Sequence, residues 1–119
     1  RVVLQPVCAV EDIRRYLRQN GYRIERDVIV FDAGRYYQAF SAVLGEEDAW
    51  PAGWPEDCCV MGPKSIEEPL FLPLASKLLN QHEKRLVKAR GTAGEAPLLE
   101  RARAMRAVKG LKSEGSICK

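Results

Sequence analysis

Residues 35–45 read as an extended run whose two faces would carry Tyr37, Ala39, Ser41 and Val43 on one side and Tyr36, Gln38, Phe40 and Ala42 on the other. The preceding run at 22–31 ends in four consecutive apolar residues. Between the two runs lies Asp32-Ala33-Gly34, which has the composition of a tight turn. Two extended runs joined by a short turn that contains glycine are typical of a β-hairpin. The sequence therefore predicts two antiparallel strands, at 22–31 and 35–45.

The chain before this hairpin predicts one more strand and a helix. A β-branched run at 2–6 reads as a strand that Pro6 stops, and the next segment, 11–21, ends in Asn-Gly, a helix-ending signal. Ile13, Tyr16 and Leu17 are expected on the buried face of that helix. A strand followed by a helix is half of a βαβ unit, so we expect an α/β fold whose parallel sheet ends in an antiparallel strand.

Residues 46–64 are predicted to form a loop, because their prolines and glycines are incompatible with a regular element. Two tryptophans, Trp50 and Trp54, lie within it. We expect them to pack the loop onto the domain. The alternative is an aromatic clamp for a nucleic-acid base.

Two amphipathic helices are predicted downstream, over 70–90 and 96–112, each with one narrow apolar stripe. A short connecting loop favours an antiparallel helical hairpin. His82 lies on or beside the apolar stripe of the first helix, and we expect it to be a packed residue rather than a ligand or a base.

Charge is distributed unevenly along the chain. Residues 1–76 carry 8 Lys and Arg against 12 Asp and Glu, a formal charge of −4, whereas residues 77–119 carry 11 against 4, a formal charge of +7. Such an asymmetry favours a polyanionic partner for the helical hairpin, the alternative being a solvated basic surface. The candidate RNA-binding residues are Lys77, Lys84, Arg85, Lys88, Arg90, Arg101, Arg103, Arg106, Lys109 and Lys112.

The remaining chemistry is sparse. There is one histidine, the four cysteines form no C-x-x-C pair, and there is no G-x-G-x-x-G or P-loop motif, so no metal site and no catalytic constellation are predicted. The chain has no signal-peptide pattern and no apolar run of about 18 residues, so we expect no membrane association and a reducing cytoplasmic location.

One combination of short motifs resembles a known family. Gln5-Pro6, Asn20-Gly21-Tyr22, Asp32-Ala33-Gly34, Tyr36-Tyr37 and Gly62-Pro63 occur in this order before a long charged helix. The order and spacing are similar to the second half of the bacterial tRNA (adenine-22 N1)-methyltransferase family, which are class I S-adenosylmethionine-dependent enzymes. The resemblance covers roughly residues 2–90.

The resemblance implies that the chain has two parts with different roles. Residues 1–63 would be the C-terminal part of a Rossmann-like methyltransferase domain, and residues 64–119 a basic, coiled-coil-like helical hairpin that binds tRNA. S-adenosylmethionine and the catalytic residues would be held by a segment upstream of Arg1, so we expect this chain alone to be inactive.

On the same reading, the substrate-proximal residues would be Gln5, Pro6, Arg35 and Tyr36, because ligands bind at the carboxyl ends of the strands in open α/β sheets. The alternatives are a non-enzymatic RNA-binding module and a protein-interaction module. A further expectation is that the strand at 2–6 pairs with 35–44 on one side only, which leaves an exposed edge through which the chain could dimerise.

Overall fold

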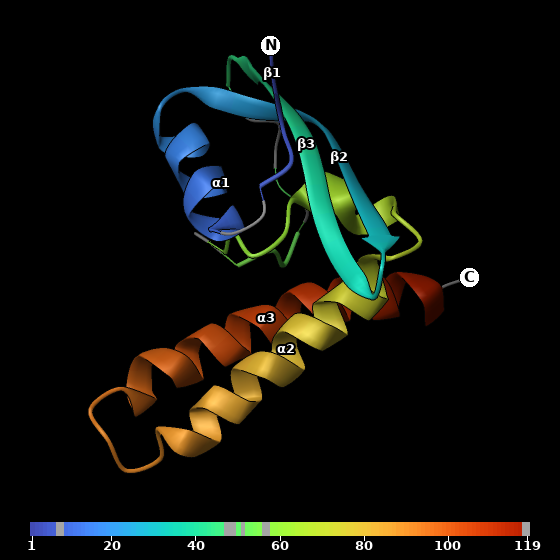
Figure 1. Ribbon diagram of the computed structural model, residues 1–119. Coiled ribbons are helices and arrows are strands. Elements are labelled where there is room, and N and C mark those ends of the chain that lie inside the picture. The colour runs from blue at the N-terminus through green and yellow to red at the C-terminus, as the bar shows by residue number, and fades with distance from the viewer. Residues whose placement is uncertain (7–8, 47–49, 51, 56–57, 118–119) are drawn as a thin grey trace.

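The computed structural model describes residues 1–6, 9–46, 50, 52–55 and 58–117 of the 119-residue chain. Within these ranges the fold is α/β: a three-stranded sheet with one helix against it, followed by a long helical hairpin (Figure 1). The elements are β1 (Val2–Leu4), α1 (Val10–Gln19), β2 (Tyr22–Asp32), β3 (Arg35–Leu44), the 3₁₀ helix η1 (Pro63–Glu67), α2 (Phe71–Lys88) and α3 (Glu95–Ile117).

The predicted β-hairpin is confirmed. Asp32 pairs with Arg35, so only Ala33 and Gly34 form the turn, and both have positive φ, 50° and 79°. Positive φ at both central residues matches the right-handed twist of the two strands. An irregularity between Ile24 and Arg26 shifts the register of β2 against β3 by one residue.

The strand order is β1-β3-β2, and both pairings are antiparallel. As expected, the first strand lies beside 35–44, with Leu4 opposite Phe40. It is shorter than the predicted 2–6: the strand ends at Leu4, and Gln5 and Pro6 lie beyond it. Among the described residues no strand pairs with the other edge of β1, where Val3 is 74% exposed. Dimerisation through this edge stays a prediction.

Helix α1 covers one face of the sheet, where Leu17 packs with Ile24, Phe40 and Ala42. The expectation that Tyr16 lies on the buried face is wrong, since Tyr16 is 62% exposed. The residue that is buried in its place is Arg14, one turn before Leu17 and on the same face.

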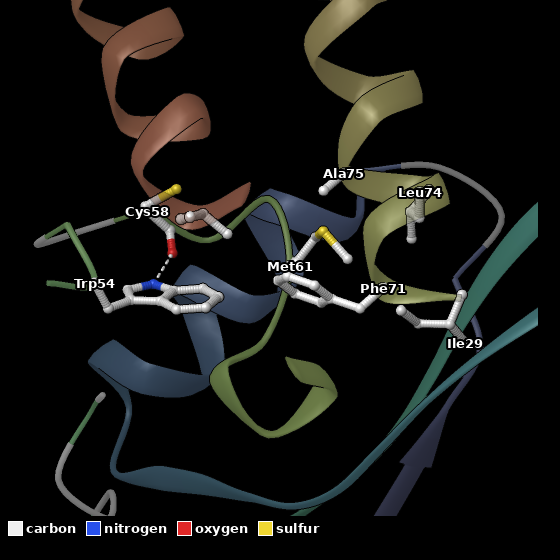
Figure 2. Close-up of a cluster of buried hydrophobic side chains, with 8 residues drawn as sticks. Ile29, Trp54, Cys58, Met61, Phe71, Leu74 and Ala75 are labelled. Atoms are coloured by element: carbon white, nitrogen blue, oxygen red, sulfur yellow. Dashed lines mark hydrogen bonds between the residues drawn. The ribbon is translucent and has the colours of Figure 1, made fainter. Parts of the chain in front are cut away.

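The described part of the 46–64 loop folds back on the domain, as predicted for its tryptophans. Trp54 is buried, and its indole N–H donates to the carbonyl oxygen of Cys58 (3.1 Å), as Figure 2 shows. Trp50 contacts Trp54 edge to face, with ring planes at 89°. The loop thus provides no pair of parallel aromatic faces, which argues against the aromatic clamp.

The helical hairpin is confirmed, with α3 longer than the predicted 96–112. His82 is buried between the helices and its Nε2 lies 2.8 Å from the carbonyl oxygen of Leu98, so it is a packed residue as expected. The base of the hairpin shares a core with the sheet and the loop: Phe71, Leu74 and Val108 pack with Ile29, Trp54, Cys58, Met61 and Ala75 (Figure 2). The far end of the hairpin extends away from this core (Figure 1).

Candidate substrate-side pocket and basic hairpin

A pocket of about 270 Å³ lies where the strands end, between the sheet and the hairpin. Because β1 ends opposite Phe40, the part of β3 from 35 to 39 has no strand beside it on that edge in the described part of the chain. Pro6, which follows β1, and Val10, which begins α1, lie beside this open edge at the pocket. The pocket is lined by Pro6, Val10, Glu11, Arg35, Tyr36, Tyr37, Gln38, Val60, Leu74, Leu78 and Arg101.

Three of the four residues predicted to be near the substrate meet in this pocket. Pro6 follows β1, and Arg35 and Tyr36 begin β3, yet all three line the same space. Gln5 is exposed and does not line it. Segments about thirty residues apart meet there because β1 and β2 run in the same direction, each antiparallel to β3.

Two tyrosines, Tyr36 and Tyr37, line the pocket, and Tyr36 has the aromatic and cationic neighbours. Its ring packs against Phe31 of the neighbouring strand, with centroids 4.7 Å apart and planes tilted by 56°. The ammonium of Lys77, on α2, lies 5.4 Å from the centroid of the Tyr36 ring. The hairpin therefore places an exposed cation beside Tyr36, a lining residue of the pocket, and Arg35, which also lines the pocket, is exposed as well.

An ion pair between Glu11 and Arg101 ties the first turn of α1 to α3 on the other side of the pocket. Arg101 Nη1 donates to Glu11 Oε2 (2.7 Å), its Nη2 contacts Oε1, and Arg15 also donates to Oε2 (3.1 Å). Burial by itself raises the pKa of Glu11, but the hydrogen bonds and charges of Arg101 and Arg15 outweigh it and leave the pKa lowered. The carboxylate is thus ionised at neutral pH.

Beneath the pocket lies a buried polar network that the sequence analysis missed. Arg14 donates to both carboxylate oxygens of Asp27 (2.9 and 2.8 Å) and to Gln38 Oε1 (2.7 Å). The amide of Gln38 in turn donates to the carbonyl oxygen of Val60 (3.0 Å). A Cβ at Gly62 would overlap Asp27 Oδ2, so the loop can pass here only with glycine.

The sequence does indicate this network, because two charged residues occupy positions that the periodicity of α1 and β2 places among buried residues. Arg14 occupies the i+4 position from Val10 on the buried face of α1, and Asp27 lies between Ile24 and Ile29 in β2. Burial raises the pKa of Asp27 and the bonds to Arg14 lower it, with the effect of burial the larger. A charged residue at a buried position of a helix, together with one in a neighbouring strand, points to a buried pair.

The predicted RNA-binding residues differ in their exposure to solvent and in whether they form ion pairs with the protein's own carboxylates. Arg101 is half-buried and engaged with Glu11, and Arg106 lies 3.5 Å from Glu83. Lys109 and Lys112 are half-buried on α3. The exposed members are Lys77, Lys84, Arg85, Lys88, Arg90, Arg103 and Arg106. Four of them lie in the last turns of α2 or just after it, away from the sheet: Lys84, Arg85, Lys88 and Arg90.

No group of three or more His, Cys, Asp or Glu side chains that could hold a metal ion occurs in the described ranges. Cys58 and Cys59 are free and buried, and burial raises the pKa of both thiols. Cys8 and Cys118 lie outside the described residues. No helix of the described chain is long and apolar enough to cross a membrane.

Comparison with known proteins relates this geometry to methyltransferases. Residues 1–40 match a family model described as a methyltransferase domain. Streptococcus pneumoniae Sp1610, described as a candidate tRNA (m1A22) methyltransferase, is similar in structure, with a TM-score of 0.68 and 22% identity; the match covers 90% of this chain and 48% of Sp1610. Its complex with S-adenosyl-L-methionine gives a TM-score of 0.65 at the same identity.

The Bacillus subtilis m1A22 tRNA methyltransferase TrmK is also similar, with a TM-score of 0.65 and 21% identity over 94% of this chain and 49% of TrmK. A search of curated proteins finds no match. At these identities the likeness establishes the fold: the α/β architecture is that of Rossmann-like methyltransferases. The chain spans about half the length of the solved structures that it resembles.

Proposed function

We propose that this chain is part of an S-adenosylmethionine-dependent methyltransferase that modifies N1 of an adenine in tRNA. The observation that carries the proposal is the fold, which matches the two bacterial structures over at least 90% of the chain. The methyltransferase-domain match at 1–40 supports the same class. The pocket lies at the carboxyl end of β1, where open α/β sheets bind their ligands.

The cofactor would supply the electrophilic methyl group, which leaves the protein the task of positioning the substrate. This chain's own residues do not fit a cofactor cradle. The connection from β1 to α1 spans residues 5–9 and contains no glycine, whereas the phosphate- and nucleoside-binding turns of such folds are rich in glycine. We therefore assign to this chain only substrate-side roles and expect it to be inactive by itself.

The helical hairpin is proposed to bind the tRNA backbone. Lys84, Arg85, Lys88 and Arg90 are exposed at its far end, and the shared core fixes the base of the hairpin against the sheet. Lysines and arginines that contact phosphates add affinity and orientation and release bound counterions. A tRNA held this way would extend from the hairpin end toward the pocket.

Binding of tRNA to the whole chain tests the proposal. Replacing Lys84, Arg85 and Lys88 with Glu is expected to weaken binding and to flatten its salt dependence, by about one unit of the log–log slope for each phosphate that is no longer neutralised. The matched control replaces Arg1, Arg23 and Arg26 with Glu, which makes the same change in net charge on the sheet.

If both triple variants weaken binding equally, the hairpin has no special role and the proposed tRNA-binding surface is wrong. Unchanged affinity of the hairpin variant at low salt would contradict the proposal outright. Loss confined to the hairpin variant is the expected outcome.

A further inference from the structure

We propose that the pocket between β3 and the helical hairpin holds one unpaired nucleotide, with its base against Tyr36 and its phosphate between Lys77 and Arg35. The inference rests on the proposed function and assigns a nucleotide subsite within it. It makes the hairpin part of the substrate pocket itself, in addition to its role as a basic surface.

The shape of the pocket suits one planar group bound at a strand edge. Its volume, about 270 Å³, is that of a site for a small ligand, near the lower limit of ordinary ligand pockets. Leu74 and Leu78 of α2 line the side opposite β3. The edge of β3 over 35–39 presents backbone groups that no described strand pairs with on that side, and these can meet the hydrogen-bonding edge of a base.

A base could stack on the Tyr36 ring with little loss of existing interaction energy. The half-buried Tyr36 ring is held by Phe31 and by the core cluster around Ile29, and its contact with Lys77 is the one that a base would replace. An exposed cation such as Lys77 over an aromatic ring contributes only about 0.5–1 kcal/mol. Stacking of a base on the ring is worth more, and the displaced ammonium would then lie beside the phosphate.

Charge at the pocket mouth favours an anionic ligand. Lys77 is exposed and contacts the Tyr36 ring, and Arg35 is exposed and lines the pocket, whereas the carboxylate of Glu11 is already engaged by Arg101 and Arg15. The floor is held in place, because the Gln38 side chain is bonded both to Arg14 and to the backbone at Val60. An aromatic ring, two exposed cations and a rigid floor match a nucleotide better than an uncharged ligand.

The test titrates the whole chain with AMP, adenosine and inorganic phosphate and follows backbone amide shifts by NMR. AMP is expected to bind saturably, with shifts at 35–38 and around Lys77, and more tightly than adenosine or phosphate alone. Tyr36→Leu should weaken AMP binding about tenfold through loss of stacking. Tyr36→Phe, which keeps the ring, should retain it.

Lys77→Gln should reduce AMP affinity and leave adenosine affinity unchanged, and Arg26→Gln, which removes an exposed cation from β2, is the control. AMP shifts that do not saturate, or equal affinity of the wild type and Tyr36→Leu, would overturn the subsite. Equal loss in Lys77→Gln and Arg26→Gln would also overturn it, since only bulk charge would then matter. The tRNA experiment is independent: hairpin-dependent tRNA binding without AMP binding refutes the subsite alone, and AMP binding without tRNA binding refutes the proposed function.

Discussion

Replacing Arg14 with Met would keep most of the length of this side chain and remove its charge. In the wild type the guanidinium donates to both oxygens of Asp27 and to Gln38, and its plane also lies over the Phe40 ring, 4.2 Å from the centroid. In Arg14→Met the Asp27 carboxyl keeps its burial and loses its cation. Asp27 cannot turn to solvent, because its side chain is entirely inaccessible.

The size of the effect follows from that burial. Removing one partner of a buried ion pair costs about 3–5 kcal/mol, since the remaining charge is left without compensation. A domain of this size unfolds with a free energy of about 5–15 kcal/mol. Arg14→Met is therefore expected to remove a large share of the free energy of unfolding. With a urea dependence of about 2 kcal/mol per molar, the midpoint should fall by about 1.5–2.5 M.

The pH dependence of the loss gives a second readout by urea unfolding. Without Arg14, the pKa of Asp27 in the folded state rises further above its unfolded value, because burial and the negative charge of Glu68 both raise it and Arg14 no longer opposes them. A folded-state pKa above the unfolded one favours folding at low pH. Stability is lost as pH rises from the unfolded pKa through the folded pKa. The Arg14→Met defect should thus be smallest in acid and largest near neutrality.

A double variant separates the charge pair from packing. Arg14→Met combined with Asp27→Leu removes both charges, and such replacements are often close to neutral. We expect the double variant to be clearly more stable than the sum of the single losses predicts. The role given to this network would be refuted if either single variant lost less than about 1 kcal/mol of its free energy of unfolding. It would also be refuted if the loss in the double variant equalled the sum of the two single losses.

Two further predictions concern the turn and the ion pair at the pocket. Ala33 has a positive φ that costs a non-glycine residue about 1–2 kcal/mol, so Ala33→Asn should raise the free energy of unfolding by up to about 1 kcal/mol, measured in urea, whereas Ala33→Val should lower it. The lowered pKa of Glu11 contributes stability that is present above its unfolded pKa and is lost as pH falls through the folded value. Glu11→Gln should therefore have a lower free energy of unfolding than the wild type at neutral pH. Measured in urea at several pH values, the free energies of the two proteins should converge in acid.

The local elements were predictable because their signals are local. The Asp32-Ala33-Gly34 turn and the alternation after it define the β-hairpin without reference to the rest of the chain. The two amphipathic helices follow from one apolar stripe each, and their pairing follows from a short loop. The predicted end of α3 at 112 is too early because the helix continues through Gly115 to Ile117, and one glycine costs a helix only about 1 kcal/mol.

The pocket was predictable only in part, because its walls come from distant segments. Pro6, Arg35 and Tyr36 follow from the rule that ligands bind where strands end. Glu11 and Arg101 are 90 residues apart, and no periodicity relates them. Arg14 was overlooked because a helical face was assigned from apolar residues alone, which placed the exposed Tyr16 inside and left out a buried arginine.

The shared core has a mechanical consequence for the proposed function. Ile29 lies in β2, Phe71 in α2 and Val108 in α3, and all three pack in one buried cluster. The backbone N–H of Ile29 also donates to Glu68 Oε1 (3.0 Å), just before α2 begins. The sheet and the base of the hairpin are thus packed as one unit. Phosphates bound at the far end of α2 would lie at a set distance from the pocket, and the tRNA that fits would be selected by shape as well as by charge.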